Sequence, residues 1–363
     1  MRIAHVIGQA IGGGVESVVL NYYKNIDREK YQFDFFIDTD STVDFKKIVE
    51  PYGGRVYVIP PYRKVKEYIE ELEKIFRQNK YKIVHSHMNT LSVFTLYAAK
   101  KAGVPIRIAH NHSTAGKGEY KKNIMKYMLR PFAKMNATDY AACSRYAGEW
   151  LFGKKSVENG EVTIFNNGID LEKFKYNENV RNAVRSKFDI ENKFVVGHIG
   201  RFCYQKNHDF LIEIFEDVHK KRSNAVLMLV GEGKLLGEVK AKVKGRGLED
   251  CVMLLGNRND VNELYQAMDV FVLPSRYEGL PVVGVEAQAA GLPCVLSDAM
   301  TKETVMQDTT VMIALDDEIE KWSNAVLKCT ERNYGAEKKM GAFDIKLIVS
   351  NLEHYYSKLM CQN

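Results

Sequence analysis

The chain lacks several features that would place it in particular classes of protein. Its six cysteines include no Cys-x-x-Cys pair, so the sequence favours reduced thiols over a disulfide framework or a zinc site. No stretch of about 18 uninterrupted apolar residues is present, which argues against a membrane-spanning helix. The opening residues, MRIAHVIG, enter a strand-like run directly, so we expect no signal peptide. The net charge is only +6 and no recognised nucleic-acid module accompanies it, so we expect no nucleic-acid partner.

The length and the order of elements predict two α/β domains. At 363 residues, with 45% apolar and 27% charged residues, the chain is typical of a soluble, cytoplasmic protein with two cores. Strand-like and helix-like segments alternate through both halves, which predicts parallel sheets covered on both faces. We expect an N-terminal domain over residues 1–170 and a C-terminal domain over residues 171–341, joined by a polar linker at 171–193. A last helix near residues 342–359 carries an apolar stripe of Ile345, Ile348, Leu352, Tyr355 and Leu359.

The most informative stretch is DVFVLPSRYEGLPVVGVEAQAAGLPCVLSD, residues 269–298. It predicts a buried strand, a polar loop with Glu278, a helix from Pro281 to about Ala290 that carries Glu286, and a further strand. Free N–H groups at such a helix start favour a phosphate. The two carboxylates could hold the remaining parts of the same ligand.

Two cations are expected at the same edge of the second sheet. Arg201 and Lys206 follow the strand Phe194–Ile199, and ligands of open α/β sheets lie outside the carboxyl ends of the strands. With the helix-start amides, the two side chains offer a cradle for a diphosphate. Glu286 then suits the two hydroxyls of a ribose, and Glu278 faces whatever the diphosphate carries.

The first half offers a glycine loop and two His-x-His pairs. Gly12, Gly13 and Gly14 allow backbone to approach a ligand, although the loop is neither a dinucleotide fingerprint nor a P-loop. The histidine pairs, residues 85–87 and 110–112, each follow a strand, so we expect them at the mouth of a cleft rather than in a core. No carboxylate completes a metal set, so one histidine that donates a hydrogen bond is preferred to a metal ion, and the others would be satisfied by backbone.

Basic residues gather between Lys117 and Lys134. Six of them, with one acid, alternate with apolar and aromatic residues. The segment is either a solvated helix face or an amphipathic element that lies on an anionic membrane surface.

The motifs together resemble those of a known enzyme family. Glu278 and Glu286, with seven residues between them in EGLP…EAQAAGLP, are similar to the E-x7-E signature of retaining GT-B glycosyltransferases, family 4. The resemblance extends to GRFCYQKNHDFL, the Gly-Glu-Gly turn at 231–233, NNGID and the GGGVE loop, and so covers essentially the whole chain. It is strongest to the capsule and exopolysaccharide branch. After Glu303 the chain departs from the family, since TVMQDTTVMIAL stands where relatives often have a glycine-rich turn.

The resemblance implies two Rossmann-like domains that face a cleft, with the final helix crossing back to the N-terminal domain. It implies that the C-terminal domain binds the donor and that no metal or other cofactor is needed. Glu278 and His112 would act at the sugar, with His110 as the fallback for His112. The implied donor-binding residues are Arg201, Lys206, Gly279, Leu280, Pro281, Glu286, Gly12, Gly13, Arg258 and Gly231.

The implied reaction moves a sugar, with retention, from a nucleotide sugar to a polysaccharide precursor. UDP is favoured over GDP, and the acceptor is expected to be lipid-linked. The enzyme would be cytoplasmic or peripheral at the inner face of the cell membrane. Two alternatives stay open: a nucleotide-sugar epimerase or hydrolase of the same fold, and a catalytically silent partner that binds a nucleotide sugar.

Overall fold

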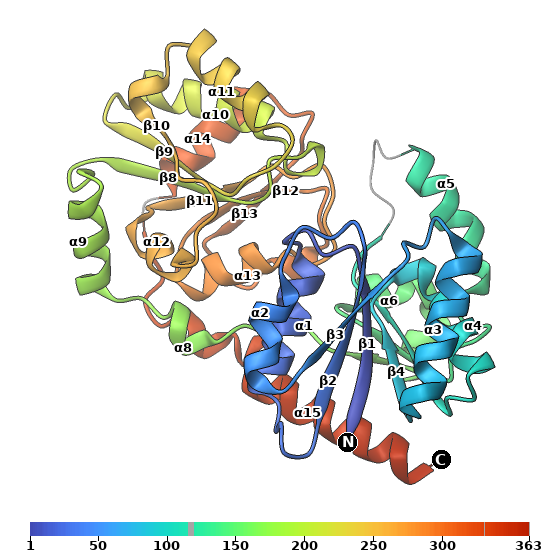
Figure 1. Ribbon diagram of the computed structural model, residues 1–363. Coiled ribbons are helices and arrows are strands. Elements are labelled where there is room, and N and C mark those ends of the chain that lie inside the picture. Colours follow the sequence, from blue (N-terminus) through green and yellow to red (C-terminus); the bar gives the residue numbers. More distant parts are fainter. Residues whose placement is uncertain (115–119, 330, 363) are drawn as a thin grey trace. The chain divides into compact units, whose positions relative to one another are not determined.

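The chain folds into two compact units. A computed structural model describes residues 1–114, 120–329 and 331–362 (Figure 1). Unit 1 comprises Met1–Gly168 and Ala342–Asn363, and unit 2 comprises Ile169–Gly341. The first boundary therefore lies after residue 168 rather than after residue 170. Among the described helices, none is both long and apolar enough to cross a membrane.

Unit 1 is built on a parallel sheet of seven strands in the order β3-β2-β1-β4-β5-β6-β7. The strands are β1 Arg2–Gly8, β2 Gln32–Asp38, β3 Arg55–Ile59, β4 Ile83–Ser86, β5 Ile106–Asn111, β6 Asp139–Ala142 and β7 Val162–Ile164. Helices connect them: α1 Gly14–Asn25, α2 Phe45–Val49, α3 Val65–Asn79, α4 Ser92–Lys101, α5 Tyr120–Leu129, α6 Arg145–Phe152 and α7 Lys154–Glu158. Because β1, β4 and β5 are neighbours, the loops that follow them lie at one edge of the sheet.

The last helix, α15 Ile345–Gln362, belongs to unit 1 and packs beside α1 (Figure 1, red). Its buried residues are Ile345, Ile348, Val349, Leu352, Tyr356 and Leu359. Tyr355, expected on the buried stripe, is only partly buried, and Tyr356 is the tyrosine with no exposed surface. The helix also approaches Gly168 closely, where an added Cβ would lie 2.9 Å from the Ile345 Cδ1 atom. Glycine at 168 therefore permits this contact.

Unit 2 has a parallel sheet of six strands in the order β10-β9-β8-β11-β12-β13. They are β8 Phe194–Ile199, β9 Ala225–Val230, β10 Val252–Leu254, β11 Val270–Leu273, β12 Cys294–Ser297 and β13 Thr310–Ile313. The helices are α8 Leu171–Phe174, α9 Glu178–Lys187, α10 His208–Lys221, α11 Leu236–Gly245, α12 Val261–Ala267, α13 Val282–Ala289 and α14 Ile319–Lys328. Every residue of β8, β9 and β11 is buried, as expected of strands covered on both faces.

The segment expected to be a linker, residues 171–193, is instead part of unit 2, so that prediction is wrong. It forms α8 and α9, and α9 packs on α12. Its charge has a structural use: the guanidinium groups of Arg181 and Arg185 both pair with the Asp269 carboxylate. That carboxylate also accepts a hydrogen bond from the Val195 amide at 2.8 Å. A partly buried ion-pair network therefore accounts for charges that resembled a solvated linker.

Candidate active site

The predicted donor-binding residues of unit 2 lie at one edge of its sheet. Arg201 and Lys206 follow β8, Gly231 follows β9, and Glu278 follows β11. These three strands are adjacent and parallel, so their carboxyl ends share an edge. Arg258 follows β10, one strand further out.

Lys206 and Glu278 contact each other directly. The Lys206 Nζ atom lies 2.8 Å from Glu278 Oε1, and the two side chains are only 14% and 10% exposed. The other carboxylate oxygen accepts a hydrogen bond of 2.9 Å from the Gln205 side-chain amide. The ammonium and the carboxylate therefore form an ion pair to which water has little access. Gln205, which the sequence reasoning missed, fixes the carboxylate from the same loop as Lys206.

Two glycines permit the loops after β8 and β9 to approach closely. Gly231 has φ +133°, and an added Cβ would lie 2.3 Å from the Gly200 carbonyl oxygen. Gly233 has φ +157°, and its added Cβ would lie 2.4 Å from the Phe202 carbonyl oxygen. Any side chain at either position would displace the loop that carries Arg201. The Arg201 side chain itself is partly exposed, and it forms no ion pair with the described residues.

The EGLP loop ends one residue later than expected. Pro281 is the N-cap of α13 rather than its first helical residue, with φ −69° and ψ 118°. Leu280 and the loop residue Gly279 are both buried. The helix itself begins at Val282, so its first free N–H groups lie directly after the loop that contains Glu278.

Glu286 lies on α13 and accepts a hydrogen bond of 3.0 Å from the Tyr265 hydroxyl of α12. Burial raises the pKa of the Glu286 carboxyl to about 7, although the Tyr265 bond and the nearby Lys173 and Lys206 charges act in the opposite direction. A carboxyl with this pKa is a hydrogen-bonding group that titrates near neutrality. Tyr265 was not identified from the sequence, because nothing in the spacing of α12 and α13 indicates the contact.

Two further side chains of unit 2 have structural partners. Arg258 forms a hydrogen bond of 2.8 Å with the Asp260 carboxylate, so its guanidinium is already paired. Gln288, on α13, accepts hydrogen bonds from the amides of Met306 and Gln307 at 2.8 and 3.1 Å. This buried amide shapes the segment after Glu303, where the chain departs from the family pattern.

In unit 1, the glycine loop after β1 is held by a side chain of α1. Gly12 has φ +76°, and Gly13 is the N-cap of α1. The Glu16 carboxylate accepts hydrogen bonds from the amides of Ile11, at 2.7 Å, and Gly13. The protein's own carboxylate thus occupies amides at this helix start. There is free space beside Gly12, since an added Cβ there would meet nothing within 4 Å.

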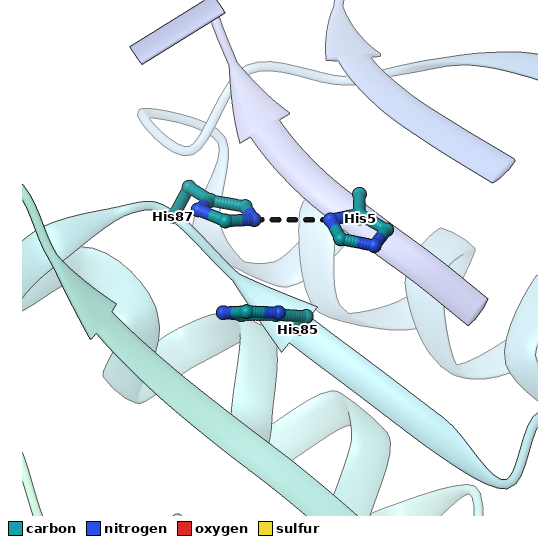
Figure 2. Close-up of side chains that lie close together, drawn as sticks. All are labelled: His5, His85 and His87. Atoms are coloured by element: carbon teal, nitrogen blue, oxygen red, sulfur yellow. Dashed lines mark hydrogen bonds between the residues drawn. The ribbon is translucent and has the colours of Figure 1, made fainter. Parts of the chain in front are cut away.

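The histidine pairs lie in the core of unit 1 and not at the mouth of a cleft. His85, His87 and His110 are at most 1% exposed, and His112 is 9% exposed. β5 extends to Asn111, so His110 is a strand residue. The rings bond to one another rather than to backbone: His87 Nδ1 lies 2.8 Å from His112 Nε2, and His85 Nε2 lies 3.0 Å from His110 Nδ1. His5 of β1 joins this cluster through His87 (Figure 2).

Burial keeps these histidines neutral. It lowers the pKa of His112 to about 3 and those of His85, His87 and His110 well below the ordinary value, with neighbouring rings adding to the effect in the last three. Of the two candidates for the active-site histidine, His112 is the more exposed and lies beyond the end of β5. Its Nδ1 atom has no hydrogen-bond partner among the described residues.

The basic segment of residues 117–134 presents apolar side chains to solvent. Ile124, Tyr127, Met128 and Phe132 are each at least half exposed, and so is Met135 directly after the segment. Some of the cations have partners within the protein: Lys126 donates to the Thr114 carbonyl oxygen at 2.9 Å, and Lys134 lies 3.2 Å from the Glu161 carboxylate. Lys117 and the side chains of Lys121 and Lys122 lie outside the described part of the structure. The surface is more apolar than the charge pattern indicated.

Comparison with known proteins decides the family. Residues 193–332 match the family model described as glycosyl transferases group 1, and residues 12–173 match glycosyltransferase family 4. A putative glycosyltransferase of Bacillus subtilis, EpsF, is 32% identical over 334 residues, which cover 90% of this chain and 87% of that protein. The chain belongs to glycosyltransferase family 4.

Other members of the family and solved structures agree. An Escherichia coli UDP-Gal:α-D-GlcNAc-diphosphoundecaprenol α-1,3-galactosyltransferase is 27% identical, over 91% of this chain and 88% of that protein. A Staphylococcus aureus capsular polysaccharide biosynthesis glycosyltransferase, CapH, is 22% identical over 98% of both. Anabaena HepE, solved in complex with UDP-glucose, has a TM-score of 0.82 with 20% identity, over 99% of this chain and all of that chain. The expected GT-B fold, with two Rossmann-like parallel-sheet units, is confirmed, and the protein is a glycosyltransferase of the polysaccharide-biosynthesis type.

Proposed function

We propose that this glycosyltransferase moves a sugar, with retention of configuration, from a UDP-sugar to a lipid-linked polysaccharide precursor. The observation that carries the proposal is the close arrangement of Lys206 and Glu278, on the same sheet edge as Arg201. A diphosphate needs cations, and the sugar attached to it needs hydrogen-bond acceptors for its hydroxyls. Both are present within one pair of adjacent loops.

Each donor group has a proposed partner. Arg201 and Lys206 bind the diphosphate, Glu286 accepts from the ribose hydroxyls, and the backbone near Gly231 and Arg258 lies along the nucleoside. Glu278, with the amides from Gly279 to Pro281, orients the sugar. His112 is the proposed contact to the transferred sugar from unit 1, and Gly12 and Gly13 form the glycine loop of that unit. The UDP in the HepE complexes and in the name of the E. coli relative favours uridine over guanosine.

The proposed reaction depends on stabilising the negative charge that develops on the leaving diphosphate. When the bond between the anomeric carbon and the phosphate oxygen breaks, its electron pair leaves with the diphosphate. Arg201 and Lys206 stabilise that charge, so we propose turnover without a metal ion. The acceptor hydroxyl attacks from the face that the diphosphate leaves, and a phosphate oxygen takes its proton. Retention is the outcome of this geometry, and no side-chain nucleophile is required.

A lipid-linked acceptor is favoured by the exposed apolar surface on and after α5. Ile124, Met128 and Phe132 stand among basic residues, which is the composition of an element that lies in the headgroup region of an anionic membrane. The E. coli relative is named for an acceptor on diphosphoundecaprenol. We therefore propose a peripheral association with the membrane in which such an acceptor would be held.

One experiment tests the donor, and a second tests the reaction. A thermal-shift panel of UDP- and GDP-sugars should raise the melting temperature most with a UDP-sugar, since a ligand bound only by the native state stabilises it. Incubation of the best donor with and without a lipid-linked saccharide, with EDTA present, should give product only with the acceptor. Turnover of donor alone would favour an epimerase or hydrolase, and stabilisation without any turnover would favour a silent binding partner.

A further inference from the structure

Five histidines and one tyrosine form a continuous hydrogen-bonded chain in the core of unit 1. The histidines come from three adjacent strands: His5 from β1, His85 and His87 at the end of β4, and His110 and His112 at the end of β5. The tyrosine is Tyr356 of α15, which is fully buried. Residues that contact each other in this cluster are up to 351 positions apart in the sequence.

Two histidine chains meet at the tyrosine. In the first, His112 Nε2 lies 2.8 Å from His87 Nδ1, and His87 Nε2 lies 3.0 Å from His5 Nδ1. In the second, His110 Nδ1 lies 3.0 Å from His85 Nε2. The Tyr356 hydroxyl lies 2.8 Å from His85 Nδ1 and 3.5 Å from His5 Nε2. The two free ends are His110 Nε2 and His112 Nδ1, which have no hydrogen-bond partner among the described residues.

The ring geometry favours proton sharing over metal binding. Ring nitrogens of His5, His85 and His87 lie within 4.8 Å of one another, close enough to suggest a metal. However, lone pairs lie in the ring plane, and the His85 ring is stacked on His87, at 4.3 Å and 24° (Figure 2). Lone pairs in stacked planes do not converge on one ion. The His5–His87 separation of 3.0 Å is a hydrogen bond and is shorter than the about 3.4 Å between two nitrogens of tetrahedral zinc.

A neutral imidazole has one N–H donor and one acceptor nitrogen, so each bond in the chain fixes the direction of the next. Only two arrangements satisfy every bond. If His112 carries its proton on Nε2, then all five histidines do, and the Tyr356 hydroxyl donates to His85. If His112 carries its proton on Nδ1, then all five do, and the hydroxyl donates to His5. In the first arrangement the free His112 Nδ1 is an acceptor, and in the second it is a donor.

We propose that Tyr356 is a positioning residue whose hydroxyl joins the two histidine chains into one relay and so couples the tautomer of His112 to that of His110. The relay itself is independent of the proposed function, and only its effect on turnover rests on that function. Without the hydroxyl, no hydrogen bond would connect His5 Nε2 with His85 Nδ1, so the tautomers of one histidine chain would no longer depend on those of the other. His5, His87 and His112 would still share one tautomer with one another, and so would His85 and His110, but the two groups would no longer have to match.

The test reads the tautomers directly by NMR of protein labelled with ¹⁵N-histidine, with resonances assigned by single His→Gln substitutions. The wild-type protein should show all five histidines neutral and in the same tautomer, and Tyr356→Phe should show tautomers that no longer match between the two groups. Tyr22→Phe is the matched control, since Tyr22 is equally buried, on α1, and its hydroxyl has no partner among the described residues. It should leave the wild-type pattern unchanged.

Mixed tautomers in the wild-type protein would overturn the proposal without any variant, and so would a uniform tautomer in Tyr356→Phe. Stoichiometric zinc uptake by the metal-free protein, with loss of these signals, would also overturn it in favour of a metal site. Turnover supplies a separate readout: Tyr356→Phe should change kcat by about tenfold or less while the KM for the donor stays constant. A uniform wild-type pattern and a split variant, in a protein that binds no nucleotide sugar, would uphold the relay and reject the proposed function.

Discussion

The Lys206 ammonium lies 2.8 Å from the Glu278 carboxylate, in loops that follow two adjacent strands. Because both side chains are largely shielded from water, the pair holds the loops together before any donor binds. A bound diphosphate would have to share or take over the ammonium. Lys206→Ala should therefore weaken donor binding or turnover by at least about tenfold, since a lost charge-assisted contact costs roughly 1.5–3 kcal/mol.

The matched control for Lys206 is Lys220, which forms a 2.7 Å pair with Glu216 on the exposed face of α10. Lys220→Ala removes an ammonium from a carboxylate in the same unit, and donor binding should stay as in the wild-type protein. Isothermal titration with UDP-glucose measures both variants. Full affinity in Lys206→Ala would remove this lysine from the donor site.

Glu286 should make donor affinity depend on pH. Its pKa is raised to about 7, so the carboxyl is largely protonated in mildly acidic solution. An ionised carboxylate accepts hydrogen bonds from ribose hydroxyls more strongly than a protonated one does. Affinity for UDP-glucose, whose diphosphate does not titrate here, should fall as pH decreases from about 8 to about 6.

Glu286→Gln should bind more weakly at high pH and lose this dependence. The Glu286→Gln substitution should also alter the stability of the ligand-free protein. Because the pKa of Glu286 in the folded protein lies above its ordinary value, ionisation of this carboxyl destabilises the fold as pH rises through about 7. The variant should therefore gain stability relative to the wild-type protein above that pH. A variant that keeps the wild-type slope in both measurements would show that another group titrates.

Gly231 should be intolerant of a side chain. A residue with φ +133° is strained by any Cβ, and this Cβ would lie 2.3 Å from the Gly200 carbonyl oxygen. Gly231→Ala should lower the free energy of unfolding by about 1–3 kcal/mol in urea denaturation. Gly237→Ala, in α11, is the control: its Cβ would meet nothing within 4 Å, so a small gain in helix stability is expected. Equal stability of the two variants would contradict the loop geometry.

The apolar surface of α5 should contribute to membrane binding. Ile124→Ser with Met128→Ser removes two side chains that are 61% and 68% exposed. Sedimentation with phosphatidylglycerol liposomes should show weaker binding, with donor affinity unchanged. Leu347→Ser, at a half-exposed position of α15 in the same unit, should bind as the wild-type protein does. If all variants bind liposomes equally, the helix is a solvated face.

The sequence determined the repeating strand–helix order and therefore the edge at which ligands bind. Parallel strands place their carboxyl ends together, so Lys206 and Glu278 could be assigned to one edge from their positions after β8 and β11. The apolar stripe of α15 followed from helical period, although Tyr356 replaced Tyr355 on its buried face. The prediction of a linker at residues 171–193 is wrong because charge in a partly buried ion-pair network has the same composition as charge in a linker.

Only the tertiary structure decided the environment of the titrating groups. Tyr265 meets Glu286 through the packing of α12 on the sheet, and no periodicity within either helix encodes that contact. The four histidines of β4, β5 and the residues just after them stand where strands end and polar loops begin, yet they are buried because His5 and Tyr356 supply hydrogen bonds that solvent would otherwise give. A strand pattern fixes which edge a side chain reaches. Whether it meets water or another ring there depends on residues hundreds of positions away.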